Sequence, residues 1–141
     1  MNDKIIGYAT GVFDLFHIGH LNILKKAKEN CDYLIVGVTT DEITFEMKKS
    51  LPIIPFDERL EIVSSIKYVD KAIAKNDVDN IQAWKQLQFN VFFKGDDWKG
   101  TEKGKRLEEY FNEFGVRVVY FPYTKGTSST HLKKVLRKII E

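Results

Sequence analysis

Short apolar runs of strand length alternate along this chain with longer segments in which apolar residues recur at helical spacing. The predicted strands cover Ile5–Ala9, Tyr33–Thr39, Lys71–Ala74, Val91–Lys94 and Val116–Phe121. The predicted helices cover Gly19–Lys28, Phe56–Tyr68, Asp79–Leu87, Thr101–Phe114 and Ser128–Ile140. A parallel sheet with crossover helices requires this alternation. The pattern therefore predicts an α/β fold in which an open, parallel, five-stranded sheet carries helices on both faces.

One segment, Thr44–Pro55, shows neither period. It carries Lys48, Lys49 and two prolines between a predicted strand and a predicted helix. We predict that it forms a mobile loop of the kind that closes over a ligand as a lid.

Length and composition narrow the class of protein. The chain has 141 residues, 43% of them apolar and 30% charged, which indicates one globular domain over residues 1–141. A formal net charge of +2, with no polybasic tail, argues against nucleic-acid and membrane partners. The apolar runs are far shorter than the roughly 20 residues that span a bilayer, and the first residues lack a signal-peptide core, so we expect a cytoplasmic protein. The one cysteine, Cys31, is expected to be a half-buried structural thiol.

Unusual residues gather where ligands bind in open α/β sheets, beyond the carboxyl ends of the strands. These segments are Thr10–His20, Thr39–Asp41, Gly95–Gly100 and Tyr123–Thr130. The chemistry of the protein is expected in them.

The first of these segments places two imidazoles near the start of a predicted helix. Backbone N–H groups and the positive end of the helix dipole attract phosphate there, and Gly19 has no Cβ to hold a phosphate away. His17 and His20 can then donate hydrogen bonds to charge that develops on phosphorus. Two structural histidines are the alternative. A zinc site is disfavoured, because Asp14 is the only nearby carboxylate and His131 the only other imidazole.

Residues 11–20 read G-V-F-D-L-F-H-I-G-H, and this pattern resembles the G-x-F-D-x-x-H-x-G-H motif of the cytidylyltransferase-like nucleotidyltransferases. Further matching segments are Thr40–Glu42, Glu58–Arg59, Tyr68–Asp70, Gly95–Trp98 and Gly126–Thr130. Within the family, the Y-V-D, G-D-D-W and final G-x-S-x-T segments are most similar to those of the glycerol-3-phosphate cytidylyltransferases. The resemblance covers nearly the whole chain and implies the Rossmann-like fold of the HxGH nucleotidyltransferases.

The resemblance also implies an activity. Members of the family transfer a nucleotide monophosphate from CTP or ATP to a phosphorylated acceptor and release pyrophosphate in the presence of Mg²⁺. For this chain the first expectation is transfer of CMP from CTP to a small phosphorylated alcohol, with glycerol 3-phosphate leading, in a homodimer. An adenylyltransferase, or a cytidylyltransferase with another phosphorylated sugar or alcohol, is the alternative. A non-catalytic nucleotide-binding module would be expected to lose His17 or His20, and this chain has both.

Residue roles follow by matching positions. The resemblance implies that His17 and His20 contact the triphosphate and stabilise the pentavalent phosphorus, and that Asp14 orients polar groups or lies near the metal. Catalytic roles are implied for His17, His20, Lys48 and Lys49. Nucleotide binding is implied for Gly11, Val12, Phe13, Asp14, Gly19, Gly95, Asp96, Thr127, Ser128, Ser129 and Thr130. Substrate binding is implied for Asp41, Lys67, Tyr123 and Lys125, and no metal ligand is assigned.

Simpler interpretations stand beside several of these roles. Asp14 is a residue type that often caps a helix N-terminus, and Lys48 and Lys49 could simply be a solvated basic pair. Asp96 fits an ordinary Asx-type turn. Arg59 fits a surface ion pair with a neighbouring acid, so we rank it below the lysines as a site residue.

The chain departs from the glycerol-3-phosphate enzymes at two positions. Tyr123 stands where their last motif has Arg. Lys67 stands in place of the Arg that begins their R-Y-V-D segment. Arg grips phosphate with two parallel hydrogen bonds and Lys acts as a point charge, so these exchanges bear on the acceptor. Lys125 is positioned in sequence to replace part of the lost charge.

Overall fold

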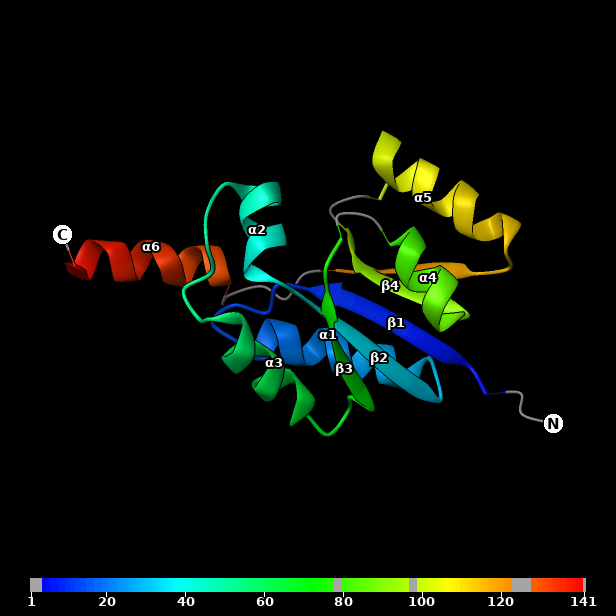
Figure 1. Ribbon diagram of the computed structural model, residues 1–141, viewed down its shortest axis with the longest axis horizontal. Coiled ribbons are helices and arrows are strands. Elements are labelled where there is room, and N and C mark those ends of the chain that lie inside the picture. The colour runs from blue at the N-terminus through cyan, green and yellow to red at the C-terminus, as the bar shows by residue number, and fades with distance from the viewer. Residues whose placement is uncertain (1–3, 78–79, 97–98, 123–127, 141) are drawn as a thin grey trace.

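The computed structural model describes residues 4–77, 80–96, 99–122 and 128–140. Within these ranges the strands are β1 (Ile6–Gly11), β2 (Tyr33–Thr39), β3 (Lys71–Lys75), β4 (Val91–Gly95) and β5 (Arg117–Phe121). They form one parallel sheet in the order β3-β2-β1-β4-β5 (Figure 1). The predicted open, parallel α/β sheet is confirmed. The order reverses between β1 and β4, so the crevice between the carboxyl ends of these two strands is the expected ligand position.

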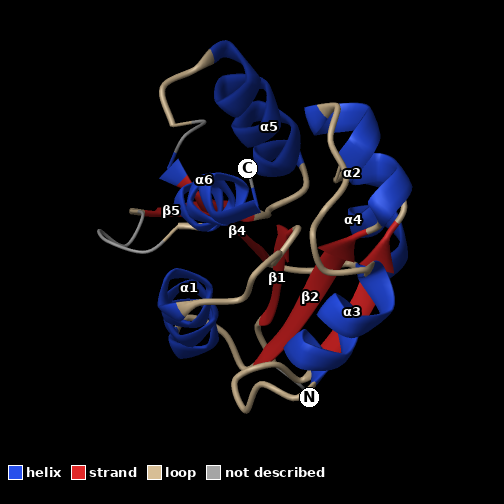
Figure 2. Cartoon of the chain, turned by 90° about the vertical axis from the view of Figure 1, so that its left-hand side faces the viewer, coloured by secondary structure: helices blue, strands red, loops and turns tan. Residues whose placement is uncertain are grey.

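Helices cover both faces of this sheet. They are α1 (Ile18–Glu29), α2 (Asp41–Lys48), α3 (Phe56–Ser64), α4 (Ile81–Leu87), α5 (Glu102–Glu113) and α6 (Ser129–Ile140). Helices α1 and α3 pack on one face, and α4 and α5 pack on the other (Figure 2). Figure 1 also shows α6 projecting away from the body of the molecule.

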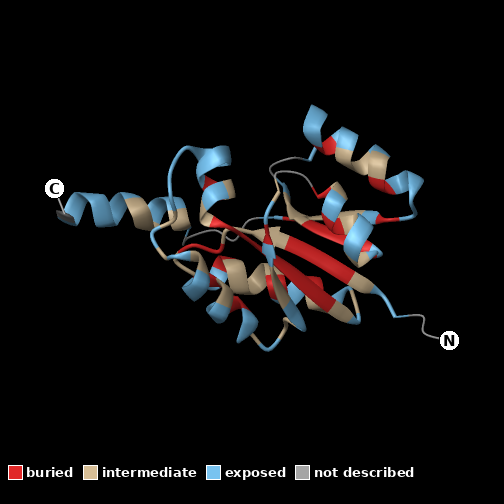
Figure 3. Ribbon diagram, viewed as in Figure 1, coloured by how far each residue is buried: buried red, intermediate tan, exposed pale blue. Residues whose placement is uncertain are grey.

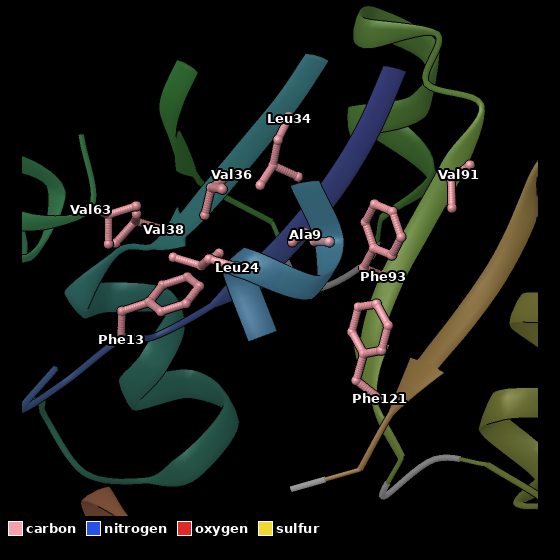
Figure 4. Packing of buried hydrophobic residues seen from close by; sticks show 11 residues of the cluster. Ala9, Phe13, Leu24, Leu34, Val36, Val38, Val63, Val91, Phe93 and Phe121 are labelled. Atoms are coloured by element: carbon pink, nitrogen blue, oxygen red, sulfur yellow. The ribbon is translucent and has the colours of Figure 1, made fainter. Parts of the chain in front are cut away.

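The two faces are separated by the alternation of side chains along each strand. Ala9 and Val36 join the cluster under α1 and α3, and their neighbours Tyr8 and Ile35 join the cluster under α4 and α5 (Figure 4 shows the first cluster). Gly37 on β2 leaves room for the Tyr8 hydroxyl, which a Cβ at that position would strike. The central strands β1, β2 and β4 are therefore largely buried on both sides (Figure 3), whereas the edge strands β3 and β5 keep exposed or half-buried residues.

The predicted helical stripes supply the middle of the core. Leu24, Ala27 and Val63 are fully buried. Cys31 is half-buried, and its thiol donates to the carbonyl of Ala27 over 3.3 Å, as expected for a structural cysteine. In the described ranges, no helix combines the length and apolar character that crossing a membrane would need.

The predicted loop Thr44–Pro55 is wrong in its first part. Residues 44–48 belong to α2, which begins because the Thr40 side chain accepts a hydrogen bond from the Ile43 N–H over 3.3 Å and because acidic residues occupy its first turn. The helix ends at Lys49, which adopts a left-handed conformation with φ of 60°. Only the connector 49–55 between α2 and α3 is irregular.

The second predicted helix, Phe56–Tyr68, is too long. Helix α3 ends at Ser64, since the chain turns at residues 66–68 to reach the start of β3. The other predicted elements begin and end within two residues of the observed bounds where both ends are described.

Candidate active site

The turn between β1 and α1 has an unusual backbone. Phe13 and Leu15 adopt left-handed conformations, with φ of 57° and 51°. The Phe13 ring lies against Gly11, where an added Cβ would come within 3.0 Å of it. Such conformations are costly for residues with a side chain, and they cluster at functional sites. This turn delivers residues 17–20 to the carboxyl edge of the sheet as the first turn of α1.

His17 and His20 form a reciprocal cap on α1. The Gly19 N–H donates to His17 Nδ1 over 3.0 Å, and the His17 N–H donates to His20 Nδ1 over 3.2 Å. The two ring centroids are 4.0 Å apart. Because each Nδ1 accepts a hydrogen bond, the hydrogen of each neutral ring is assigned to Nε2. Both imidazoles therefore offer an Nε2–H donor.

Both rings are held neutral at pH 7. Burial lowers the pKa of His17 below its ordinary value of 6.5. Burial, and then the neighbouring His17 and the Lys48 ammonium, lower the pKa of His20 to about 4, although Asp14 opposes this. The site consequently meets an incoming anion with neutral donors, and the fixed positive charge comes from elsewhere.

We expect acid to destabilise the protein through His20. The unfolded chain binds a proton near pH 6.5 and the folded chain only near 4, so the free energy of unfolding decreases as pH falls through this window. The whole shift would be worth about 3 kcal/mol, and partial solvent access to the ring reduces it to roughly 1–2 kcal/mol. Urea unfolding at pH 7 and 4.5 measures the loss.

His20→Asn provides the matched comparison, because Asn Oδ1 can take the hydrogen bond of Nδ1 without titrating. The variant should lose clearly less stability than the natural chain between the two pH values. Asp14 and Asp70, whose pKa values lie below 3.8, weaken the fold only at lower pH. Equal losses in both proteins would contradict the assignment to His20.

Asp14 is buried and bridges three parts of the chain. Its carboxylate accepts the N–H groups of Ile53 and Ile54, each over 2.8 Å, and lies 2.9 Å from Lys133 Nζ on α6. Burial alone would raise the pKa of Asp14, but these hydrogen bonds and the Lys133 charge outweigh it and lower the pKa. The N-cap interpretation of Asp14 is wrong, because His17 occupies the cap position. Asp14 instead orients polar groups, the first of its two expected roles.

The start of α6 lies beside this turn. Ser129 Oγ donates to the Asp14 carbonyl over 2.6 Å. Ser128 Oγ accepts the His131 N–H over 3.1 Å, and Thr130 is exposed. The N-terminal turn of α6 thus contacts the turn that leads into α1, and a helix N-terminus favours an anion. Thr127 lies outside the described residues.

The two predicted lysines occupy different environments. Lys48 is the last residue of α2, and its charge acts on His20. Lys49 is the exposed left-handed residue that follows. The structure therefore brings Lys48 into electrostatic range of the histidines, which favours Lys48 over Lys49 as the residue that reaches a phosphate.

Arg59 has a role that the sequence analysis missed. It is 1% exposed, and its guanidinium donates to the carbonyl of Ile54 in the connector, to two carbonyls at the carboxyl ends of β1 and β2, and to the Asp41 carboxylate. The acceptors and distances are Ile54 O (2.9 Å), Val12 O (2.6 Å), Thr39 O (2.8 Å) and Asp41 Oδ1 (2.6 Å). The expected surface ion pair is wrong. A signal was present, because Arg59 shares its helix face with Phe56 and Val63, at spacings of three and four.

Two residues predicted to bind ligands, Asp41 and Val12, accept hydrogen bonds from Arg59. Asp41 accepts from Arg59 with one oxygen and from the Phe56 N–H over 3.3 Å with the other. The carbonyl of Val12 is likewise taken by Arg59. Both residues therefore help to hold Arg59 in place. The two Asp41 carboxylate oxygens and the Val12 carbonyl all accept hydrogen bonds within the protein.

The other predicted residues lie partly at the site. Gly95 ends β4, the neighbour of β1, and the exposed Asp96 follows it, so both are at the same carboxyl edge. Lys67 is not brought there: it precedes β3 and its ammonium lies 5.2 Å from the Tyr68 ring centre, near the amino ends of the strands. The structure therefore does not place Lys67 with the histidines as a substrate-binding residue, because parallel strands put their amino and carboxyl ends at opposite edges of the sheet. Tyr123 and Lys125 lie outside the described residues.

Comparison with known proteins identifies the family. A family model described as cytidylyltransferase-like matches residues 8–135. The chain belongs to the cytidylyltransferase-like family. Membership confirms the resemblance based on residues 11–20 and establishes the chain as a nucleotidyltransferase.

Individual relatives of this cytidylyltransferase-like chain cover nearly all of it. Glycerol-3-phosphate cytidylyltransferase of Bacillus spizizenii is 39% identical over 132 residues, which are 93% of this chain and 95% of the relative. FAD synthase of Thermococcus kodakarensis is 33% identical over 98% of this chain and 93% of its own. The crystal structure of the lipopolysaccharide core biosynthesis protein from Thermoplasma volcanium has a TM-score of 0.72 and 31% identity, and covers 88% of this chain and 99% of its own. The predicted Rossmann-like fold is thus also found in solved relatives.

Proposed function

We propose that this cytidylyltransferase-like protein transfers CMP from CTP to a small phosphorylated alcohol, first of all glycerol 3-phosphate, and forms a CDP-alcohol and pyrophosphate. The observation that carries the reaction type is the pair of neutral imidazoles at the start of α1, which follow a turn that the start of α6 contacts. The 39% identity to a glycerol-3-phosphate cytidylyltransferase supports the choice of substrates.

The reaction depends on positioning the two reactants and neutralising phosphate charge, and it needs no covalent intermediate. An acceptor phosphate oxygen forms a bond to the α-phosphorus, and the bond from that phosphorus to the bridging oxygen breaks as pyrophosphate leaves. The Nε2–H groups of His17 and His20 donate to the oxygens that gain charge in the transition state. Lys48 and the N–H groups at the start of α6 neutralise the departing phosphates.

Mg²⁺ is the proposed cofactor, bound together with CTP. In the part of the chain that the structure describes, no three His, Cys, Asp or Glu side chains come together in a way that could hold a metal ion. Mg²⁺ commonly uses one or two carboxylates together with substrate phosphates and water, so a preformed cage is unnecessary. We therefore propose that the metal arrives on the triphosphate and balances its charge.

Two further proposals concern the state of the protein. We place it in the cytoplasm as a homodimer, on the strength of the family resemblance. Sedimentation of the purified chain tests the dimer, and a single species of 16.4 kDa would contradict it.

An adenylyl transfer is the second candidate, because the FAD synthase relative is 33% identical over almost the entire chain and FAD contains an adenylyl group. The histidine arrangement would serve either nucleotide. Discrimination must come from contacts with the base, for which Gly95 and Asp96 are the proposed readers.

We expect CTP to exceed ATP by at least about tenfold in kcat/KM, which is roughly 1.4 kcal/mol and within the reach of hydrogen bonds to a base edge. Pyrophosphate release is measured for four nucleoside triphosphates against a panel of phosphorylated alcohols and sugars. A mock preparation from cells that do not express the protein serves as the blank for contaminating enzymes. ATP equal to or better than CTP with the best acceptor would replace the cytidylyl proposal with the adenylyl one.

A further inference from the structure

Lys133 on α6 touches the catalytic turn without belonging to any of the motifs that mark the family in this sequence. Its Nζ lies 2.9 Å from Asp14 Oδ2, although the two residues are far apart along the chain. The Asp14 side chain is only 2% exposed and that of Lys133 23%. A charge-assisted hydrogen bond in such a sheltered position is stronger and more geometrically exact than one in water.

Within the described residues, helix α6 lies largely outside the apolar core. It projects from the body of the molecule (Figure 1), and most of its residues are exposed (Figure 3). Val135, Leu136 and Ile139 are 40%, 37% and 74% exposed, so apolar burial contributes little to the placement of its later turns. Among the contacts described for α6, the two that join it to the turn after β1 are those of Ser129 and Lys133 with Asp14.

These two contacts bind Asp14 through both its backbone and its side chain. Ser129 donates to its backbone carbonyl, and Lys133 pairs with its carboxylate one helical turn later. Two contacts a turn apart fix both the position and the rotation of the first turn of α6. The same carboxylate accepts the N–H groups of Ile53 and Ile54, so the connector 49–55 is also held in place by Asp14.

We infer that Lys133 is a positioning residue: by pairing with Asp14 it aligns the N-terminal turn of α6 and the connector 49–55 with the His17–His20 turn. The inference rests on the proposed function in one respect, namely that the aligned N–H groups receive the triphosphate. Lys133 acts through Asp14 and does not itself reach the nucleotide. Its effect should fall on CTP rather than on the acceptor.

Three variants test this assignment. Lys133→Met keeps the aliphatic stem and removes the charge, Lys133→Arg keeps a charge that can pair with a carboxylate, and Lys134→Met removes the adjacent, exposed charge of the same helix. We expect Lys133→Met to raise KM for CTP at least about tenfold with a smaller change in KM for the acceptor. The other two variants should stay within about twofold of the natural chain.

Outcomes other than this overturn the inference. A lower Tm for Lys133→Met with an unchanged KM for CTP would show that Lys133 merely stabilises the fold. An equal rise in KM for Lys134→Met would show a general effect of helix charge. Failure of Lys133→Arg to restore the KM would show that the ion pair is not what matters.

A second measurement needs no turnover and so separates this inference from the proposed function. Amide hydrogen exchange of the ligand-free protein is followed at Ile53, Ile54 and Leu132 by NMR. Lys133→Met should speed exchange at these amides at least about tenfold and Lys134→Met should not, since the first variant loosens the shared anchor. If the natural chain transfers no nucleotide, this result still stands. Unchanged exchange in Lys133→Met overturns the positioning role whatever the substrate is.

Discussion

Replacing His17 or His20 with alanine is expected to lower kcat by tenfold to a thousandfold, which corresponds to about 1.4–4 kcal/mol of transition-state stabilisation lost with one donor. Each imidazole is oriented by a hydrogen bond to Nδ1 that leaves the Nε2–H as its donor. Removing a ring removes that donor from the reacting phosphate. Steady-state rates with CTP and glycerol 3-phosphate measure the loss.

The same rings cap α1, so alanine variants also lose helix stability, by roughly 0.5–2 kcal/mol. His17→Asn and His20→Asn separate the two effects, because the amide oxygen can accept the capping N–H while the ring donor is gone. The Asn variants should keep most of the stability and still lose the rate. Nearly full turnover in either Asn variant would show that the imidazoles are structural caps and not catalytic groups.

Replacing Arg59 with methionine is expected to lower the free energy of unfolding by about 3–5 kcal/mol. The change leaves three backbone carbonyls without the donor that satisfies them, and it leaves the Asp41 carboxylate without its cation. A loss of this size in a chain of 141 residues lowers Tm by roughly 10–20 °C. Thermal and urea unfolding give the two quantities.

Arg106→Met is the control, since Arg106 is 74% exposed and its ion pair with Glu102 spans 3.8 Å, an interaction worth less than about 1 kcal/mol. Arg59→Lys keeps the charge but loses the planar fork that reaches four acceptors, so it should recover less than half of the loss. Full stability in Arg59→Lys would show that charge alone matters. A loss in Arg59→Met no greater than in Arg106→Met would remove Arg59 from the support of the site.

The fold was predictable because its signals are local and repeated. The central strands are apolar on both faces, as in β2, where six of seven residues are buried, and such runs are typical of strands inside a covered parallel sheet. Helix α2 escaped prediction because its start depends on the single Thr40 cap and its apolar residues Phe45 and Met47 remain exposed, so no stripe marks it.

The candidate site divides along the same line. The spacing of His17 and His20 at the end of a strand indicated a phosphate site, and the structure adds the tautomers and the cap that orients them. Spacing could place Arg59 on the buried face of its helix but could not name its four acceptors, and it gave no sign that Asp14 pairs with Lys133. An ionisable side chain in a sequence has the same letter whether its partner is water or a residue a hundred positions away.

By itself, therefore, the sequence determined the class of sheet, the edge at which ligands bind and the family motif, since periodicity and short-range spacing are preserved in any conformation that buries the apolar residues. Tertiary structure alone decided which charges are buried, which carboxylates already have partners and which lysine lowers the pKa of His20. Those properties depend on desolvation and on contacts between segments distant in the chain. Asp14 illustrates both kinds of information. Its place in the motif is visible in ten consecutive residues of the sequence. Its side-chain partners Ile53, Ile54 and Lys133 come from the connector and α6, and they reach it only in the folded chain.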